Sequence, residues 1–75
     1  MKEKIKLLMS EILKVDIKVL EDDLAIGDIP EWDSLHHMMI MTALGKEFNI
    51  SFTKEDLVEL EDVKDIVALV CEKTI

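Results

Sequence analysis

A chain of 75 residues is long enough for one domain with one small core, and its apolar share of 49% argues against wholesale disorder. Seventeen acidic residues against nine basic ones, all lysine, give a net charge of −8, which argues against general nucleic-acid binding. This charge favours basic protein partners, and it also keeps a small domain soluble. The single cysteine, Cys71, rules out an internal disulfide and fits a cytoplasmic location. Neither a signal peptide nor membrane insertion is expected.

The first amphipathic segment runs from Lys2 to about Val15. Ile5, Leu8, Met9 and Ile12 follow the i, i+3, i+4, i+7 spacing of one helical face. This spacing predicts a first helix that buries one stripe of apolar side chains.

Residues 16–33 predict a long loop, because Gly27 and Pro30 interrupt regular structure. Connections of this length in a small domain are functional or are held by their own side chains. A short helical turn is expected near residues 21–24. The apolar residues expected to hold the loop against the core are Leu20, Leu24, Ile26, Ile29 and Trp32.

A second helix is predicted from Ser34 to Phe48, where Ile40, Leu44 and Phe48 recur every fourth residue. Asn49 suits the left-handed stop that ends many helices. Ser34 is expected at or near the N-cap, where a side-chain oxygen accepts from backbone N–H groups.

Two shorter helices are predicted after this one. Thr53 and Asp56 have the spacing of a capping box for a third helix at about residues 54–59. Asp62 can cap a fourth helix, whose expected buried stripe is Val63, Ile66, Val67 and Val70. The predicted fold is therefore all-α: a small four-helix bundle, residues 1–75 as one domain and a monomer, with a long first connection and a short third helix.

Asp33-Ser34-Leu35 before an apolar helix resembles the phosphopantetheine attachment motif of acyl carrier proteins and of the related peptidyl carriers. The resemblance covers nearly the whole chain and extends to its acidity and helix order. It implies that a phosphopantetheinyl transferase attaches 4'-phosphopantetheine from coenzyme A to Ser34, with Asp33 and Leu35 flanking the site. It also implies a carrier that is no enzyme, and whose partners are acyl-transferring or condensing enzymes.

The physics of a helix start suits this role. A phosphodiester just outside a helix N-terminus meets unpaired N–H groups and the positive end of the dipole. A flexible arm also raises the effective concentration of its cargo at a docked enzyme. Two simpler roles remain open here, because Ser34 could be a plain helix cap and Asp33 an ordinary capping or loop carboxylate.

The resemblance also implies a docking surface and a cargo pocket. The second helix carries few carboxylates, unlike that of fatty-acid carriers, so a specialised carrier with a more apolar docking surface is favoured. The expected docking residues are His36, His37, Met39, Thr42 and Lys46. The expected pocket lining is Met38, Met41, Leu44, Leu60, Val63 and Ile66, with Leu35 also beside the arm and Met38 expected to fill the core.

Several functions remain open at this point. The cargo is expected to be an acyl intermediate of fatty-acid, polyketide or related lipid biosynthesis, or alternatively an aminoacyl or peptidyl group on a carrier with a closed core. A helical interaction module without a prosthetic group is the rival. A hydrolase using Ser34 and His37 is disfavoured, because no third group orients the pair. No metal site is expected, since His36 and His37 point about 100° apart on a helix.

Overall fold

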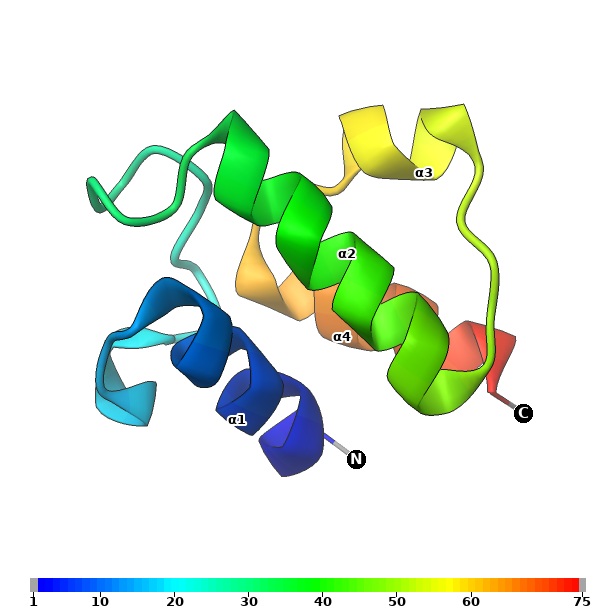
Figure 1. Ribbon diagram of the computed structural model, residues 1–75, viewed down its shortest axis with the longest axis horizontal. Coiled ribbons are helices and arrows are strands. Elements are labelled where there is room, and N and C mark those ends of the chain that lie inside the picture. The colour runs from blue at the N-terminus through cyan, green and yellow to red at the C-terminus, as the bar shows by residue number, and fades with distance from the viewer. Residues whose placement is uncertain (1, 75) are drawn as a thin grey trace.

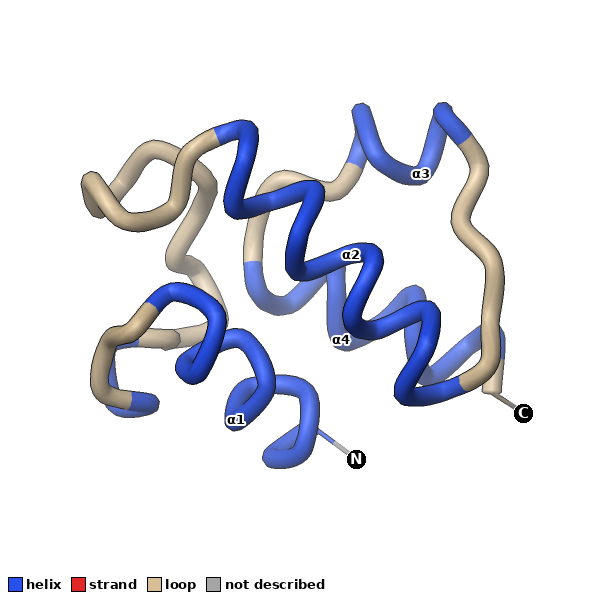
Figure 2. Tube along the Cα trace, in the orientation of Figure 1, coloured by secondary structure: helices blue, strands red, loops and turns tan. Residues whose placement is uncertain are grey.

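The computed structural model describes residues 2–74, which form a small helical bundle and confirm the predicted fold (Figures 1 and 2). Its elements in order are α1 (Lys2–Leu13), the 3-10 helix η1 (Ile17–Val19), α2 (Ser34–Phe48), α3 (Lys54–Glu59) and α4 (Val63–Lys73). Both α2 and α3 begin and end at the expected residues, whereas α1 ends slightly earlier than expected. Within residues 2–74 no helix is long and apolar enough to cross a membrane.

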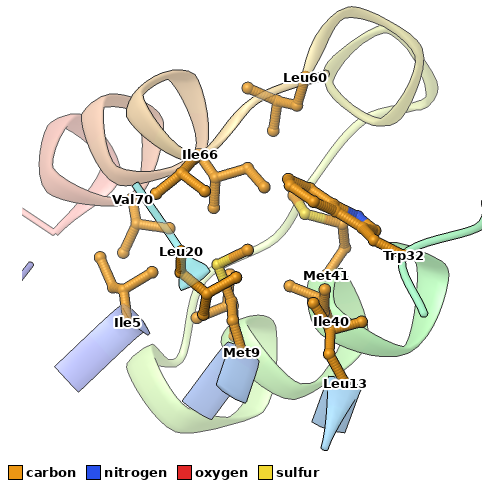
Figure 3. Close-up of a cluster of buried hydrophobic side chains, with 12 residues drawn as sticks. Ile5, Met9, Leu13, Leu20, Trp32, Ile40, Met41, Leu60, Ile66 and Val70 are labelled. Carbon is orange, nitrogen blue, oxygen red and sulfur yellow. The ribbon is translucent and has the colours of Figure 1, made fainter. Parts of the chain in front are cut away.

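Three of the helices make the core, and α3 lies outside it. α1 contacts both α2 and α4, and each of the three contributes a stripe of buried side chains. α3 lies to one side of the bundle (Figure 1) and contributes no fully buried residue. Its Leu57 is partly buried and packs against the core. The core, drawn in Figure 3, comprises Ile5, Met9, Leu13, Leu20, Trp32, Ile40, Met41, Leu44, Leu60, Val63, Ile66 and Val70.

The long connection between α1 and α2 is held by its own side chains, as predicted. Leu20 and Trp32 are fully buried, and Leu24, Ile26 and Ile29 pack against the core. The helical turn in this connection lies earlier than expected, at η1, because Asp16 caps it by accepting from the Lys18 N–H at 2.9 Å. Residues 21–24 form a hydrogen-bonded turn instead.

Backbone hydrogen bonds join the middle of this connection to the segment before α4. The Ile26 N–H donates to the Glu61 carbonyl at 2.7 Å, and the Val63 N–H donates to the Leu24 carbonyl at 3.0 Å. The loop carbonyl thus satisfies a donor in the first turn of α4, which has no acceptor within its own helix. The loop and the start of α4 therefore hold each other in place.

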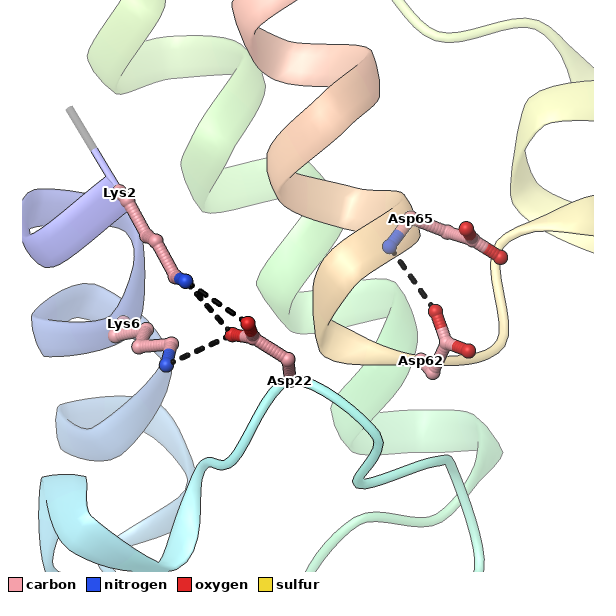
Figure 4. Close-up of polar contacts among 5 residues, drawn as sticks. All are labelled: Lys2, Lys6, Asp22, Asp62 and Asp65. Atoms are coloured by element: carbon pink, nitrogen blue, oxygen red, sulfur yellow. Dashed lines mark hydrogen bonds and ion pairs between the residues drawn. The ribbon is translucent and has the colours of Figure 1, made fainter.

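Asp22 adds a polar link between α1, the loop and α4 (Figure 4). Its carboxylate pairs with the ammonium groups of Lys2 at 2.9 Å and Lys6 at 3.1 Å, and its carbonyl accepts the Lys64 N–H at 3.0 Å. Hydrogen bonds from the two lysines lower the pKa of the Asp22 carboxyl. Because these groups are partly exposed, the ion pairs orient the loop more than they stabilise the fold.

The caps predicted for the later helices are present. Thr53 and Asp56 form the reciprocal capping box of α3, and Asp62 accepts from the Asp65 N–H at 3.0 Å to cap α4 (Figure 4). Asn49 ends α2 with a φ of 54°. These local signals fix where each helix starts or stops.

Replacing Leu20 by alanine tests whether the loop depends on its buried side chains. We expect the free energy of unfolding to fall by about 2–5 kcal/mol, as for other buried leucines, because a cavity is left behind. Leu7→Ala, at a position 52% exposed, should change the free energy of unfolding by less than about 0.5 kcal/mol. Urea unfolding followed by circular dichroism measures both, and equal losses would show that the loop is not held this way.

Candidate functional site

Helix α2 is capped by Asp33 and not by Ser34. Asp33 has extended backbone angles, and its Oδ1 accepts the His36 N–H at 2.9 Å. Ser34 is accordingly the first residue of the helix itself. Ser34 thus lies next to the N-cap, within the expected placement, but it is not itself a plain cap, because the carboxylate one position earlier already satisfies that donor.

This arrangement leaves the Ser34 hydroxyl available. The side chain is exposed, and within residues 2–74 it has no hydrogen-bond partner. The N–H groups of Ser34 and Leu35 lie in the first turn, where a helix provides no acceptor for them. An exposed hydroxyl next to free donors and a positive dipole end fits a phosphodiester.

The Asp33 carboxylate also binds the side chain of His36. Nδ1 of the ring lies 2.7 Å from Oδ1 of Asp33, the same oxygen that accepts the backbone N–H. The backbone N–H and then the ring of His36 lower the pKa of the Asp33 carboxyl, so that it remains ionised near neutral pH. The predicted docking residue His36 is therefore half-buried and directed at the cap.

His37 is buried, which makes its assignment to the docking surface wrong. It is 5% exposed, and its Nδ1 accepts a hydrogen bond from Nε1–H of the fully buried Trp32 at 3.2 Å. Since consecutive helical residues differ in direction by about 100°, His37 points inward. Sequence analysis missed this pairing, and the only signal for it was that Trp32 was expected to contact the bundle.

The bond from Trp32 also decides where the His37 proton lies. Because Nδ1 is the acceptor, the neutral ring carries its hydrogen on Nε2, which is buried and, within residues 2–74, makes no hydrogen bond of good geometry, although the backbone of Leu57 and Leu60 lies near enough to affect the pKa of the ring. Burial lowers the pKa of His37, and the carbonyl groups of Leu57 and Leu60 oppose this only in part. We infer that His37 is neutral in the folded protein.

The outward side of α2 is apolar beside Ser34. Leu35 is 66% exposed, and Met38 and Met39 are each nearly half exposed, so the expectation that Met38 fills the core is wrong. Between α1 and α2 lies a groove of about 430 Å³. Its lining comprises Ile12, Leu35, Met38, Met39, Thr42, Ala43 and Lys46. Met39, Thr42 and Lys46 are three of the five expected docking residues.

The six residues expected to line a cargo pocket do not share a cavity. Leu44, Leu60, Val63 and Ile66 are buried in the packed core. Only Met38 and Met41 line a second surface groove, of about 510 Å³, between α2 and the chain leading to α3. Its other lining residues are Thr42, Gly45, Lys46, Asn49, Ile50, Ser51, Phe52 and Leu57.

Neither histidine can act as a base for Ser34 in this arrangement. The His36 ring is bonded to Asp33, and His37 is buried against Trp32. Within residues 2–74 no base contacts the serine hydroxyl, which argues against the hydrolase.

A family model described as a phosphopantetheine attachment site matches residues 3–70. The chain belongs to this family of carrier domains. It carries 4'-phosphopantetheine as its cofactor and is not itself catalytic. A search of curated proteins finds no match. The free hydroxyl of Ser34 at the helix start fits the group that gives this family its name.

The buried state of His37 predicts acid sensitivity. Its pKa is below the value of about 6.5 expected in the unfolded chain, so between these two values only the unfolded chain takes up the proton. The free energy of unfolding should therefore fall as the pH drops below 6.5, by up to about 1.4 kcal/mol per pH unit. Three carboxyls also have a lowered pKa: Asp22, Asp33 and Asp56. They change the pH dependence of the free energy of unfolding only near and below their ordinary pKa of 3.8.

His37→Asn tests this assignment, because the amide oxygen of asparagine replaces the Nδ1 acceptor but does not titrate. Urea unfolding of both proteins at pH 7.5, 6.5, 5.5 and 5.0 gives the comparison. We expect a weaker dependence on pH in the variant. Parallel curves for the two proteins would contradict the assignment.

Proposed function

We propose that Ser34 is the attachment point of the 4'-phosphopantetheine arm, and that the arm carries acyl groups as thioesters to enzymes of lipid or polyketide-type biosynthesis. The observation that carries this proposal is the state of the Ser34 hydroxyl. It is exposed at the first residue of α2 and is relieved of capping by Asp33. No other serine of the chain combines this position with the tripeptide Asp33-Ser34-Leu35.

The attachment step balances with coenzyme A as the co-reactant. The Ser34 oxygen forms a bond to the phosphorus next to pantetheine, the pyrophosphate bond breaks, and the nucleotide half leaves with the electron pair. The hydroxyl proton passes to a base of the transferase, since within residues 2–74 no basic group contacts the Ser34 hydroxyl. Asp33 would hold the first turn of α2 in place during the reaction through its bonds to His36.

The partners proposed here are a phosphopantetheinyl transferase and acyl-transferring or condensing enzymes. Any of them must cover the start of α2 in order to reach Ser34 or its arm. The surface it meets there is apolar at Leu35 and Met39, with Thr42 and the positive charge of Lys46 further along. α2 carries only Glu47 as an acidic residue, which supports docking by apolar contact over docking by charge and disfavours service to a fatty-acid synthase with basic docking patches.

Intact mass spectrometry tests the attachment. Incubation with coenzyme A, magnesium and a promiscuous phosphopantetheinyl transferase should add one phosphopantetheine to the wild-type chain and none to Ser34→Ala. Ser51→Ala, which removes another exposed serine, should be modified at the wild-type rate. Unchanged mass of the wild-type chain, or modification of Ser34→Ala, would overturn the proposal and favour the interaction module without a prosthetic group.

The apolar docking surface is tested by the rate of that same modification. We expect the double variant Leu35→Ala/Met39→Ala to lower kcat/KM of the transferase by about tenfold, equivalent to about 1.4 kcal/mol, because both side chains lose contact area. Val58→Ala removes an even more exposed apolar side chain, from α3, and should leave kcat/KM unchanged. Equal effects of the two variants would mean that docking does not depend on this groove.

A further inference from the structure

The Trp32 indole occupies the part of the core where a cargo pocket was expected. Trp32 is fully buried and belongs to the same cluster as Met41, Leu60 and Ile66. Figure 3 shows the indole extending from the loop toward these three side chains. Each of the three was expected to line an acyl pocket, and here each packs in the cluster that contains the indole.

Both the side chain and the backbone of Trp32 are fixed. The indole N–H donates to His37 Nδ1 at 3.2 Å, with the two ring centroids 6.0 Å apart. The backbone N–H donates to the Ile29 carbonyl at 3.2 Å, and the carbonyl accepts the Gly27 N–H at 2.9 Å. Gly27 has a φ of 89°, which few residues other than glycine adopt. Moving the indole aside would break a buried hydrogen bond and strain this turn.

The choice of histidine at position 37 is informative. An apolar residue here would leave the indole N–H buried without an acceptor, and it would avoid the buried Nε2–H that histidine brings, which has only poorly aligned carbonyl groups of Leu57 and Leu60 near it. The chain therefore tolerates one poorly satisfied buried donor and obtains in return an acceptor for Trp32. This is the arrangement expected if the position of the indole matters.

Space for cargo exists on the surface instead. The two grooves beside α2, of about 430 and 510 Å³, both have Met38 in their lining, and Met38 is about half exposed. Unbranched methionine side chains adapt to varied contacts. An acyl group on an arm at Ser34 can lie over this side of α2, but a long alkyl chain there would remain largely in water.

We propose that the Trp32–His37 pair fills the interior of this carrier and keeps cargo outside it, so that the protein serves short or polar acyl groups, such as aminoacyl groups, in preference to long alkyl chains. The inference rests on the proposed attachment at Ser34. It assigns to Trp32 a role in cargo selection in addition to holding the loop.

The test compares two cargoes on the same arm. A promiscuous transferase loads acetyl-phosphopantetheine or octanoyl-phosphopantetheine from the matching coenzyme A thioester, and intact mass confirms each product. In the wild-type chain both loaded forms should melt at the same temperature, and the methyl NMR signals of Met41, Leu60 and Ile66 should not differ between them. In Trp32→Leu, the octanoyl form should melt several degrees above the acetyl form, and these methyl signals should shift.

One control and one reserve variant make the result specific. Ile5→Ala opens a hole at the other end of the cluster in Figure 3, and octanoyl loading should not stabilise it. Trp32→Phe is the second variant if Trp32→Leu does not fold, because it keeps an aromatic ring but is smaller and has no N–H donor. Ile5→Ala and Trp32→Phe are studied by the same melting and NMR measurements.

Two outcomes overturn the proposal: octanoyl-dependent methyl shifts in the wild-type chain, or no response to octanoyl in the folded Trp32 variant. Failure of attachment is seen separately, as an unchanged mass. In that case free S-octanoyl-pantetheine is added to the wild-type chain and to the variant, and the same methyl signals decide. Binding by the variant alone supports the proposal, and binding by both or by neither overturns it.

Discussion

The hydrogen bond from the Trp32 indole to His37 is the contact on which the functional end of this molecule depends. Trp32 ends the long connection after α1, and His37 lies in the first turns of α2, so their bond fixes the connection to the helix that it precedes. Asp33 and Ser34 lie between the two residues. A buried bond of this kind is strong because neither partner has water as an alternative. The position of Ser34, the proposed attachment residue, therefore follows from the packing of Trp32 two positions earlier.

Either Asp33 or Ser34 is a residue type that could cap α2, but only a serine has the hydroxyl that the proposed phosphodiester needs. Both aspartate and serine are favoured helix caps, and at this helix the carboxylate takes the role. The serine hydroxyl consequently has no hydrogen-bond partner within residues 2–74, which suits the proposed attachment of phosphopantetheine. The ionised carboxylate also holds His36 against the helix start, so that the first turn is rigid before any enzyme binds.

Helix α2 carries apolar residues on both its buried and its exposed side. Its inward side contributes Ile40 and Leu44 to the core, whereas its outward side exposes Leu35, Met38 and Met39 next to Ser34. The negative charge of this chain lies mostly outside α2. A partner that docks on α2 therefore gains affinity more from apolar contact area than from electrostatic attraction. Together with an interior filled by Trp32, this surface supports the proposal that the carrier meets both enzymes and cargo on the outside of the bundle.

Local chemistry in the sequence determined the helices, because caps and apolar spacing act over a few residues. Thr53, Asp56 and Asp62 cap where expected, Asn49 ends α2, and the tripeptide around Ser34 pointed to the family that the family match confirms. The rotation of α2 was decided only by tertiary structure. This helix is apolar around most of its circumference, so its pattern did not show that His37 faces inward and Met38 outward. The sequence did not place Trp32 among the expected pocket residues for the same reason, since only packing in one cluster with Leu60 and Ile66, distant in sequence, puts the indole there.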